Sequence, residues 1–278
     1  MPRPTTRSEA LARLRNTLDS GKIIIGAGAG VGLSAKLAEK AGADFIVLYN
    51  SGLYRMHGLG SLAGLMPYGD ANAIVCDMAQ TVLPQVKSRP VVAGVCATDP
   101  FRDLSVFLPH LRSLGFIGIQ NFPTVGLIDG NFRQNLEDTG MSYAKEVAMI
   151  KLAHSMDFLT VPYVFTVEQA VEMTKSGADV LVVHFGLTAQ GTIGARNTTA
   201  PKEAADTAQK IRDAVTAIRG DIIVLVHGGY VANVDDFKDI MERTIGIQGF
   251  LGASTFERIP LEDILPSVIK DFKMVEPQ

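Results

Sequence analysis

The chain contains 278 residues, of which 47% are hydrophobic and 20% are charged, and its formal net charge is −3. Lysine and arginine form no basic block, which argues against nucleic acid or an anionic membrane as the main partner. Two cysteines are too few for a disulfide framework, and the hydrophobic content argues against disorder for nearly the whole length. Because no apolar run has the length of a signal peptide or a membrane span, we expect a cytoplasmic protein.

Eight short apolar runs alternate with longer segments of helical pattern. The runs predict strands at 22–26, 44–49, 90–95, 116–120, 158–164, 179–184, 222–227 and 247–252. Helices are predicted at 31–41, 71–87, 103–114, 143–154, 166–176, 203–218, 233–243 and 260–272. A near-continuous apolar run is typical of a strand buried on both faces of a parallel sheet. Eight strand–helix units therefore predict an α/β fold, the (β/α)8 TIM barrel.

A short helix is predicted before the first strand. Thr6-Arg-Ser-Glu9 has the spacing of a capping box, and leucines follow it at helical intervals. We expect this helix to pack on the bottom or the side of the barrel. Residues 1–20 are then an N-terminal helical extension, and residues 21–278 form a single barrel domain.

The connections between the predicted elements are of unequal length. Short connections with a glycine lead from helix to strand, whereas the segments 50–70, 121–142 and 185–202 are long and lead from strand to helix. In a (β/α)8 barrel these long loops meet at the face where active sites lie, so we expect them to carry function. A Lys-x-Gly-Ala-Asp pattern occurs at 40–44 and again at 175–179, as a trace of duplication or as two ordinary turns.

Alternating glycines follow the first predicted strand, from Gly26 to Gly32. The G-x-G-x-x-G spacing of a dinucleotide fingerprint occurs in no register, and no acidic residue ends the second strand. We therefore expect no NAD. Gly28 is a candidate substrate-binding residue because glycine lets backbone N–H groups approach a ligand, although a tight turn alone would also use it.

Small residues end the last two predicted strands. In many (β/α)8 enzymes the two loops at this place bind an anion through backbone N–H groups and a helix N-terminus. A phosphate, a carboxylate or a flavin phosphate would each fit, and tight packing at the barrel rim is the alternative. The candidate anion-binding residues are Gly228, Gly229, Gly252, Ala253 and Ser254.

Polar side chains end several of the predicted strands, where a parallel barrel brings them together. His184 and His227 end adjacent strands, and histidine is the natural proton-transfer group near neutral pH. Asp99 is a candidate to orient a histidine, and Cys96 is a candidate nucleophile or simply a small buried residue. Further candidates for substrate binding at neighbouring strand ends are Tyr49, Asn50, Ser51, Gln120 and Asn121.

A divalent metal, magnesium or zinc, is a candidate cofactor at the same edge. His184, His227 and Asp99 are plausible ligands, although their strands do not all neighbour one another. Magnesium prefers carboxylates, and few acids fall near the mouth. Glu257 is one of these acids and is a further catalytic candidate.

The loop at 50–70 carries Arg55 among glycines that can act as hinges. This composition is typical of a lid that brings a cation to an anionic substrate. The alternative is a loop that passes over the rim of the barrel and has only a structural role.

Several long strings in the chain resemble the phosphoenolpyruvate hydrolase-like (β/α)8 family. They include residues 60–72, 94–101, 119–130 and 249–258, and the similarity runs from about residue 8 to residue 272. The resemblance implies a barrel related to the phosphoenolpyruvate mutase and isocitrate lyase group, whose members bind Mg2+ through acids after the middle strands. Here those strands end in Tyr-Asn-Ser and Gln-Asn instead.

Together these features predict an enzyme that acts on a small anionic keto-acid-like substrate. It would cleave a bond next to the carbonyl, as a hydrolase or a lyase, with phosphoenolpyruvate or phosphonopyruvate as the substrate class that the resemblance implies. Arg55, Asn50 and Gln120 would stabilise oxyanion charge. A non-catalytic barrel that binds a ligand or a partner and a flavin-dependent oxidoreductase are the alternatives. We expect a homo-oligomer.

Overall fold

The structure is a computed structural model that describes residues 2–276. Within these residues nine short parallel strands form one sheet in the order β5-β4-β3-β2-β1-β9-β8-β7-β6. Their bounds are β1 Ile24–Gly28, β2 Phe45–Leu48, β3 Val91–Val95, β4 Gly118–Asn121, β5 Leu159–Thr160, β6 Tyr163–Val164, β7 Val180–His184, β8 Ile223–His227 and β9 Gly249–Gly252.

The two ends of this sheet are halves of one extended segment. Only Val161 and Pro162 separate β5, which pairs with β4, from β6, which pairs with β7. The N–H of Val161 donates to the carbonyl of Ile119, and the carbonyl of Pro162 accepts from the N–H of Val182, each over 2.9 Å. The sheet therefore closes, and the predicted (β/α)8 barrel is confirmed. Its predicted fifth strand is split in two at Pro162, which has no N–H to give to the ladder.

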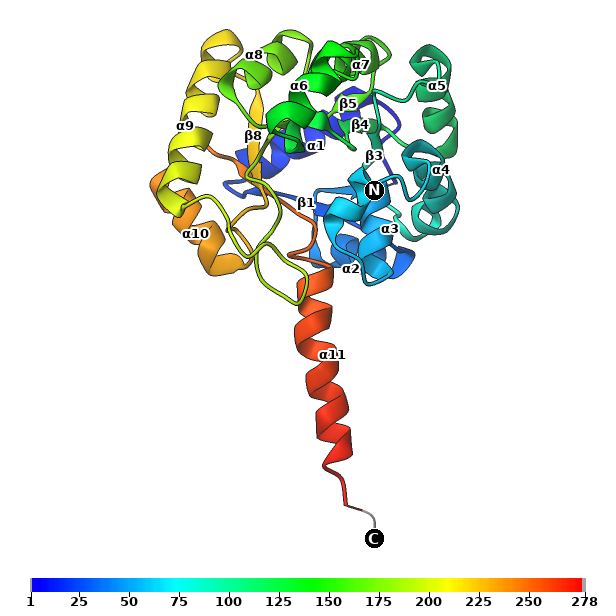
Figure 1. Ribbon diagram of the computed structural model, residues 1–278, viewed down its shortest axis with the longest axis vertical. Helices are drawn as coiled ribbons and strands as arrows, with labels where there is room; N and C mark the ends of the chain where they lie inside the picture. Colours follow the sequence, from blue (N-terminus) through cyan, green and yellow to red (C-terminus); the bar gives the residue numbers. More distant parts are fainter. Residues whose placement is uncertain (1, 277–278) are drawn as a thin grey trace.

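Helices surround the barrel, and the last helix projects away from it (Figure 1). Those that follow the strands as predicted are α2 Gly32–Ala41, α4 Ala71–Val82, α5 Leu104–Leu114, α7 Tyr143–Ser155, α8 Val167–Lys175, α9 Pro201–Ile218, α10 Val234–Arg243 and α11 Arg258–Lys273. Gly42 and Gly115 follow α2 and α5 with φ angles of 100° and 110°, the left-handed conformation expected of a glycine that ends a helix. No helix among the described residues is long and apolar enough to cross a membrane.

Two further helices lie within segments that the sequence predicts as loops. They are α3 Asn50–Met56 and α6 Gly130–Asp138, and short 3-10 helices occur at η1 Ser61–Leu65, η2 Leu83–Gln85 and η3 Val125–Leu127. The prediction of continuous loops at 50–70 and 121–142 is therefore wrong. α3 buries polar side chains, Asn50 and Arg55 among them, and α6 buries none of its residues. Neither helix has the apolar periodicity by which a helix is recognised in sequence.

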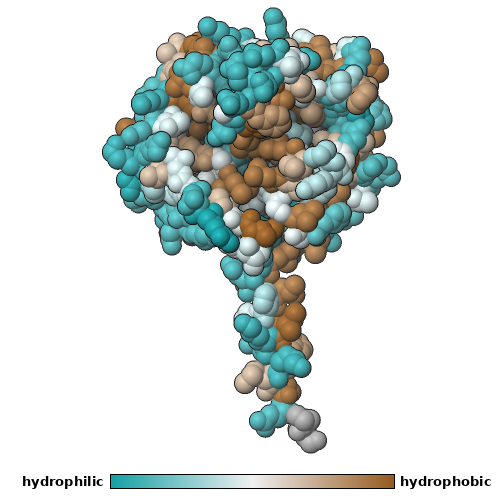
Figure 2. Space-filling view, viewed as in Figure 1, coloured by the Kyte–Doolittle hydropathy of each residue, from teal (hydrophilic) through white to brown (hydrophobic). Residues whose placement is uncertain are grey.

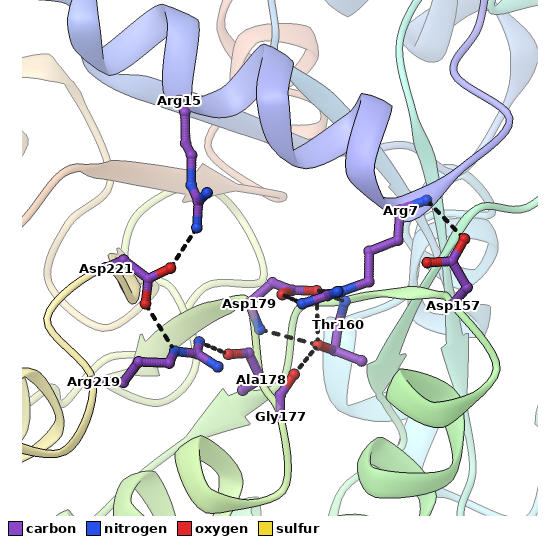
Figure 3. Close-up of polar contacts among 9 residues, drawn as sticks. All are labelled: Arg7, Arg15, Asp157, Thr160, Gly177, Ala178, Asp179, Arg219 and Asp221. Atoms are coloured by element: carbon purple, nitrogen blue, oxygen red, sulfur yellow. Dashed lines mark hydrogen bonds and ion pairs between the residues drawn. The ribbon is translucent and has the colours of Figure 1, made fainter.

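The predicted N-terminal helix, α1 Arg7–Asp19, lies across the bottom of the barrel. Thr6 caps it by accepting from the N–H of Glu9, as the capping box predicts. Arg7 forms two hydrogen bonds to the buried carboxylate of Asp179, and Arg15 forms an ion pair with Asp221 (Figure 3). These contacts join α1 to the amino-terminal ends of β7 and β8.

The repeated Lys-x-Gly-Ala-Asp pattern places its two aspartates in equivalent positions. Asp44 accepts from the N–H of Ile25 and Asp179 accepts from the N–H of Thr160, so each aspartate binds the backbone of the strand beside its own. Asp44 also accepts from the hydroxyl of Thr17, near the C-terminal end of α1, while Asp179 holds Arg7 at its N-terminal end. The two copies of the pattern therefore hold opposite ends of one helix.

Side chains of the strands form two core layers, one between sheet and helices and one inside the barrel. Because strand side chains alternate, residues two apart share a face. Val180 and Val182 on β7 belong to the inner layer, as do Ile223 and Leu225 on β8. The next inward positions on the two strands are His184 and His227, so the core packing itself directs both histidines into the barrel mouth.

Candidate active site

The inward-facing residues at the carboxyl ends of the strands line a small cavity in the barrel mouth. It encloses about 410 Å3, including its opening to solvent. Because this volume includes open solvent, the enclosed part is small and suits only a ligand of few heavy atoms. The lining residues are Tyr49, Ser51, Arg55, Ser61, Leu62, Phe122, Leu127, Tyr163, His184, Gly186, Leu187, Thr188, His227, Ala253 and Ser254.

His184 and His227 lie side by side, with ring centroids 4.6 Å apart. The Nδ1 of His184 accepts a hydrogen bond of 2.9 Å from the N–H of Gly186, so in a neutral ring the proton is on Nε2. The Nδ1 of His227 is 2.6 Å from the carbonyl of Leu251, which can only accept, so this nitrogen carries the proton. The two Nε2 atoms therefore differ, since His184 offers a donor there and His227 an acceptor.

Both histidines are neutral near pH 7. Burial lowers the pKa of His227 from its ordinary 6.5 to about 4. Burial also lowers the pKa of His184 well below its ordinary value, and the neighbouring His227 lowers it further. A neutral pair with one donor and one acceptor can give a proton to one atom of a ligand and take a proton from another.

Arg55 reaches the cavity from α3 and forms a buried ion pair with Glu257. The two atoms of the pair, Nη2 and Oε2, are 3.0 Å apart, and each side chain is only 1% exposed. The other oxygen of Glu257 accepts from the N–H of Gly30 over 2.6 Å and from the hydroxyl of Ser34 over 2.5 Å. Glu257 is thus held by the β1–α2 turn, and it fixes the position of the guanidinium.

The guanidinium of Arg55 keeps unused hydrogen-bonding capacity. Burial by itself lowers its pKa, but Tyr49 and Glu257 outweigh that effect and raise the pKa above the ordinary value, so the group remains charged. Its Nε is buried and has no hydrogen-bond partner among the described residues. The protein therefore leaves part of the hydrogen-bonding capacity of this guanidinium unused, on a residue that lines the cavity.

Two tyrosines form the wall between Arg55 and the histidines. The guanidinium lies 5.5 Å from the ring centroid of Tyr49, and the ring of Tyr163 packs against both imidazoles at 4.7 and 5.1 Å. Burial and the neighbouring Tyr49 raise the pKa of Tyr163 well above 10, so its phenol stays protonated. The aromatic wall keeps the environment of the histidines apolar.

Four of the predicted substrate-binding residues line this cavity. They are Tyr49, Ser51, Ala253 and Ser254. The hydroxyl of Ser51 donates to the carbonyl of Ser61 over 2.6 Å, and the hydroxyls of Ser61 and Ser254 are 3.3 Å apart. The loop after β2 and the loop after β9 therefore meet at this side of the mouth.

The three predicted amide side chains do not line the cavity and are bound to other protein groups. Asn50 donates to the carbonyl of Gly64, and Asn121 donates to the buried carboxylate of Glu146 over 2.6 Å. Gln120 donates to the carbonyl of Val161, but its buried Oε1 has no partner among the described residues. Asn50 and Asn121 thus stabilise loops in this structure.

The predicted glycines bring protein segments together. The N–H of Gly229 donates to the carbonyl of Gly186 over 3.0 Å, and a Cβ on Gly228 would lie 2.4 Å from the same oxygen. A Cβ on Gly252 would lie 2.3 Å from the ring of Phe256, and one on Gly28 would lie 2.8 Å from the hydroxyl of Tyr49. The N–H of Gly229 is therefore bound to protein, and a side chain at Gly28, Gly228 or Gly252 would collide with neighbouring protein atoms.

Cys96 and Asp99 line a different cavity, of about 1220 Å3 including open solvent, between the loops after β2, β3 and β4. Asp99 accepts from Asn72 over 2.8 Å and from Arg102 over 2.5 Å. Burial raises the pKa of the Cys96 thiol, which makes it a weaker nucleophile at neutral pH. The structure thus does not bring these two candidates together with the histidines.

Comparison with known proteins identifies the family. The model of the phosphoenolpyruvate hydrolase-like family matches residues 9–275. The chain belongs to this family. It is also 52% identical to the ToMV resistance protein Tm-1(GCR237) of Solanum lycopersicum, over 97% of this chain and 36% of that protein. The chain therefore spans about a third of the length of this tomato relative.

Solved structures with the same fold include a phosphoenolpyruvate phosphomutase from Streptomyces platensis subsp. rosaceus, with a TM-score of 0.63, 16% identity and coverage of 96% of this chain and 92% of that one. A phosphonopyruvate hydrolase in complex with oxalate and Mg2+ matches with a TM-score of 0.57, 16% identity and coverage of 95% and 88%. At this identity the likeness shows the fold.

The donor set at the mouth of this phosphoenolpyruvate hydrolase-like barrel does not fit a divalent metal. No group of three His, Cys, Asp or Glu side chains within residues 2–276 is arranged to hold one. Asp99 lines the other cavity and is therefore apart from His184 and His227, the other two predicted metal ligands. Both oxygens of Glu257 are already bound, by Arg55, Gly30 and Ser34.

Sequence reasoning missed the loop residues of the cavity and one buried acid. Ser61 and Thr188 line the cavity from segments with no periodic pattern. Glu146 on α7 accepts from Asn121, Thr124 and the N–H of Val125, and burial raises its pKa to about 7. In sequence it is one more acid in the first turn of a helix, so only its burial distinguishes it.

Proposed function

We propose that the mouth cavity is an active site that cleaves a bond next to the carbonyl of a small anionic keto acid. The observation that carries this proposal is the pair of neutral histidines with a donor on one Nε2 and an acceptor on the other. This combination suits hydrolysis, because the acceptor can take a proton from the attacking water while the donor stabilises the oxygen of the developing enolate.

In this mechanism Arg55 binds the carboxylate of the substrate, and Glu257 fixes the guanidinium that does so. His227 takes a proton from water through Nε2 as the water oxygen forms its bond to the electrophilic atom. The electrons of the breaking bond pass to the leaving carbon as an enolate, whose oxygen accepts a hydrogen bond from the Nε2–H of His184. The imidazolium of His227 then gives its Nε2 proton to the leaving carbon, which restores both neutral rings, whose centroids are 4.6 Å apart.

The family and the names of its structural relatives support the substrate class. One relative in fold is called a phosphonopyruvate hydrolase and another a phosphoenolpyruvate phosphomutase. Both names contain a three-carbon acid whose carboxylate would suit Arg55. The small cavity likewise favours a substrate of few heavy atoms.

The test is a substrate panel with direct product detection. Phosphonopyruvate, phosphoenolpyruvate and oxaloacetate are each incubated with the protein and followed by NMR, with EDTA and separately with Mg2+. Hydrolysis of at least one of them is expected, with comparable rates in both media, and the variant His184→Ala/His227→Ala serves as the background control. Absence of turnover of every compound in both media would contradict the proposal.

A second candidate is a barrel that binds a small anion or a partner without chemistry. The donor set favours it, since Glu257 is neutralised by Arg55 and Asp99 lies in another cavity. The 52% identity to a plant protein named for virus resistance also favours it. Calorimetric binding of one of the panel compounds, lost in Arg55→Met and accompanied by no turnover, would identify this function.

A further inference from the structure

The protein groups at the mouth cavity have no net charge. Arg55 is the one side chain with a full charge at neutral pH among the described residues that line it. Glu257 cancels this charge, because its carboxylate lies 3.0 Å from the guanidinium and both side chains are 1% exposed. The Nδ1 of His184 accepts from the N–H of Gly186, which requires a neutral ring, and His227 beside it is neutral near pH 7 as well. The cavity therefore offers a ligand one cation that is already paired.

The other side chains around the cavity are largely apolar, and the polar ones among them are uncharged. Figure 2 shows hydrophobic residues in the middle of the barrel face on which α3 lies, with hydrophilic residues mostly toward its outer edge. The apolar lining residues include Leu62, Phe122, Leu127 and Leu187, and the hydroxyl-bearing ones include Ser51, Ser61, Thr188 and Ser254. A ligand that matches this lining has one anionic end and is otherwise uncharged.

A substrate with one carboxylate suits the cavity better than a substrate with two anionic groups. The buried Nε of Arg55 has no hydrogen-bond partner among the described residues, and a guanidinium is a favourable partner for a carboxylate. A second anionic group would meet leucine side chains and neutral histidines, and an unpaired buried charge is costly. No group of three His, Cys, Asp or Glu side chains within residues 2–276 is arranged to hold a metal ion that would neutralise it.

We propose that the substrate is an acylpyruvate, a 2,4-dioxo acid with one carboxylate and a short apolar acyl group. This inference rests on the proposed function, because it names the substrate of the same site. The carboxylate pairs with Arg55, and the end of the acyl group lies among Leu62, Leu127 and Leu187. The products are a short-chain carboxylic acid and pyruvate.

The chemistry of an acylpyruvate matches the histidine pair. The oxygen of water forms a bond to the acyl carbonyl carbon, and the Nε2 of His227 takes one proton of that water. The bond from this carbon to the neighbouring methylene breaks, and its electron pair forms the enolate of pyruvate, whose oxygen accepts from the Nε2–H of His184. The imidazolium of His227 gives its proton to the methylene carbon, which becomes the methyl group of pyruvate. The acyl group leaves as a carboxylic acid with the second proton of water, which it loses to solvent.

The charge that develops during this reaction strengthens the preference for a monoanion. The enolate adds one negative charge to that of the carboxylate, and the Nε2–H of His184 is the donor that stabilises it. A substrate that enters with two charges would reach three at the same stage, beside the same single cation. The preference should therefore appear in kcat/KM as well as in binding.

Acetylpyruvate and oxaloacetate form a matched pair of substrates for the test. They have equal numbers of non-hydrogen atoms and differ at one position, where oxaloacetate has a carboxylate oxygen and acetylpyruvate has a methyl group. The ratio of their kcat/KM values therefore reports the effect of charge rather than of size. We expect acetylpyruvate to be favoured by roughly tenfold or more, because a second charge in this cavity has no partner.

A lysine at the mouth should change this ratio. Leu62 lines the cavity and is 45% exposed, so Leu62→Lys adds a cation where the chain can accept one. The ratio should fall by about tenfold, because the ammonium attracts the second carboxylate of oxaloacetate and has no such effect on a methyl group. Leu59→Lys is the matched control, because Leu59 is 44% exposed in the same segment and is outside the cavity lining. It should keep the wild-type ratio.

The experiment adds acetylpyruvate to the substrate panel and follows the release of acetate and pyruvate by NMR, with His184→Ala/His227→Ala as the background. Circular dichroism checks the fold of both lysine variants, and the wild-type ratio decides the outcome alone if Leu62→Lys does not fold. A kcat/KM for oxaloacetate or phosphonopyruvate equal to or above that for acetylpyruvate would overturn the acylpyruvate assignment and leave the proposed function standing. Equal ratios in Leu62→Lys and Leu59→Lys would also overturn the assignment. No turnover of any compound would overturn both.

Discussion

The two ends of the barrel bury charged groups in different ways. At the bottom, the carboxylate of Asp179 accepts two hydrogen bonds from Arg7 and further bonds from the N–H and hydroxyl of Thr160. At the mouth, Arg55 has an ion-pair partner but keeps an unpartnered buried Nε, and the two histidines are neutral in an apolar wall.

This difference distinguishes polar groups that stabilise the fold from polar groups that can still bind a ligand. Fully partnered polar groups stabilise a fold, whereas orphaned donors, and below about pH 6.5 depressed histidine pKa values, reduce the free energy of unfolding. Such groups persist in functional sites because a ligand completes them. We therefore expect substitutions of the fully partnered carboxylates, Asp179 and Glu257, to change stability, and substitutions of the histidines at the mouth to change turnover or binding.

The largest effect is expected for His227→Gln. Loss of the acceptor Nε2 should lower kcat/KM for the substrate found in the panel about 1000-fold, or about 4 kcal/mol in transition-state stabilisation. Steady-state kinetics of the purified variant measures the loss. His110→Gln, at an exposed position of α5, is the control and should retain wild-type turnover. Equal turnover in the two variants would remove His227 from the chemistry.

Glu257→Gln should cause the next largest effect, on stability. It leaves Arg55 as an uncompensated buried charge, which costs about 3 kcal/mol in the free energy of unfolding. The double variant Arg55→Met/Glu257→Gln removes the charge and should recover much of this loss, because the pair is coupled. Urea unfolding of the two single variants and the double variant measures the coupling. Additive losses would show that the buried pair is not an energetic unit.

The sequence was sufficient for the fold and for part of the site. Eight apolar runs at regular spacing predict the strands, and strand alternation directs His184 and His227 to one face because core residues precede them at even intervals. The (β/α)8 barrel and the adjacency of the two histidines are therefore consequences of local pattern.

The rest of the site depends on contacts that have no local signal. Glu257 meets Arg55 across 202 positions of sequence, and Asn121 meets Glu146 across 25. Cys96 and Asp99 also end a strand region, yet they turn toward a separate cavity because Asn72 and Arg102 hold that loop. A strand end predicts the edge of the barrel on which a residue lies, and the loops decide which cavity it enters.

At the bottom of the barrel, Asp179→Ala is expected to destabilise the fold without altering the site. It leaves the buried N–H of Thr160 unbonded and frees Arg7, for a loss of about 2 kcal/mol in the free energy of unfolding. Asp221→Ala is the matched control, because it breaks ion pairs with Arg15 and Arg219 that are partly exposed and should cost about 0.5 kcal/mol. Chemical denaturation of both variants compares them. If Asp221→Ala lowered the free energy of unfolding more than Asp179→Ala, a buried and fully hydrogen-bonded carboxylate would not be the stronger contributor to stability.

A dependence of the free energy of unfolding on pH, with a definite sign, is also expected. The pKa of His227 is about 4 in the folded protein and ordinarily 6.5, so below about pH 6.5 the unfolded chain binds a proton that the folded protein does not. The free energy of unfolding should therefore fall by about 1.4 kcal/mol per pH unit between these two values on account of this residue. His227→Gln lacks this term, so it should gain stability relative to wild type as the pH falls through that range.

Glu146 should make the free energy of unfolding depend on pH with the opposite sign. Its pKa rises from an ordinary 4.5 to about 7, so the folded protein binds the extra proton, and wild type should lose stability relative to Glu146→Gln as the pH rises through that range. Urea unfolding of wild type and both variants at several pH values separates the two slopes. Parallel curves for His227→Gln and wild type would contradict a depressed histidine at the mouth, whatever the slope at Glu146.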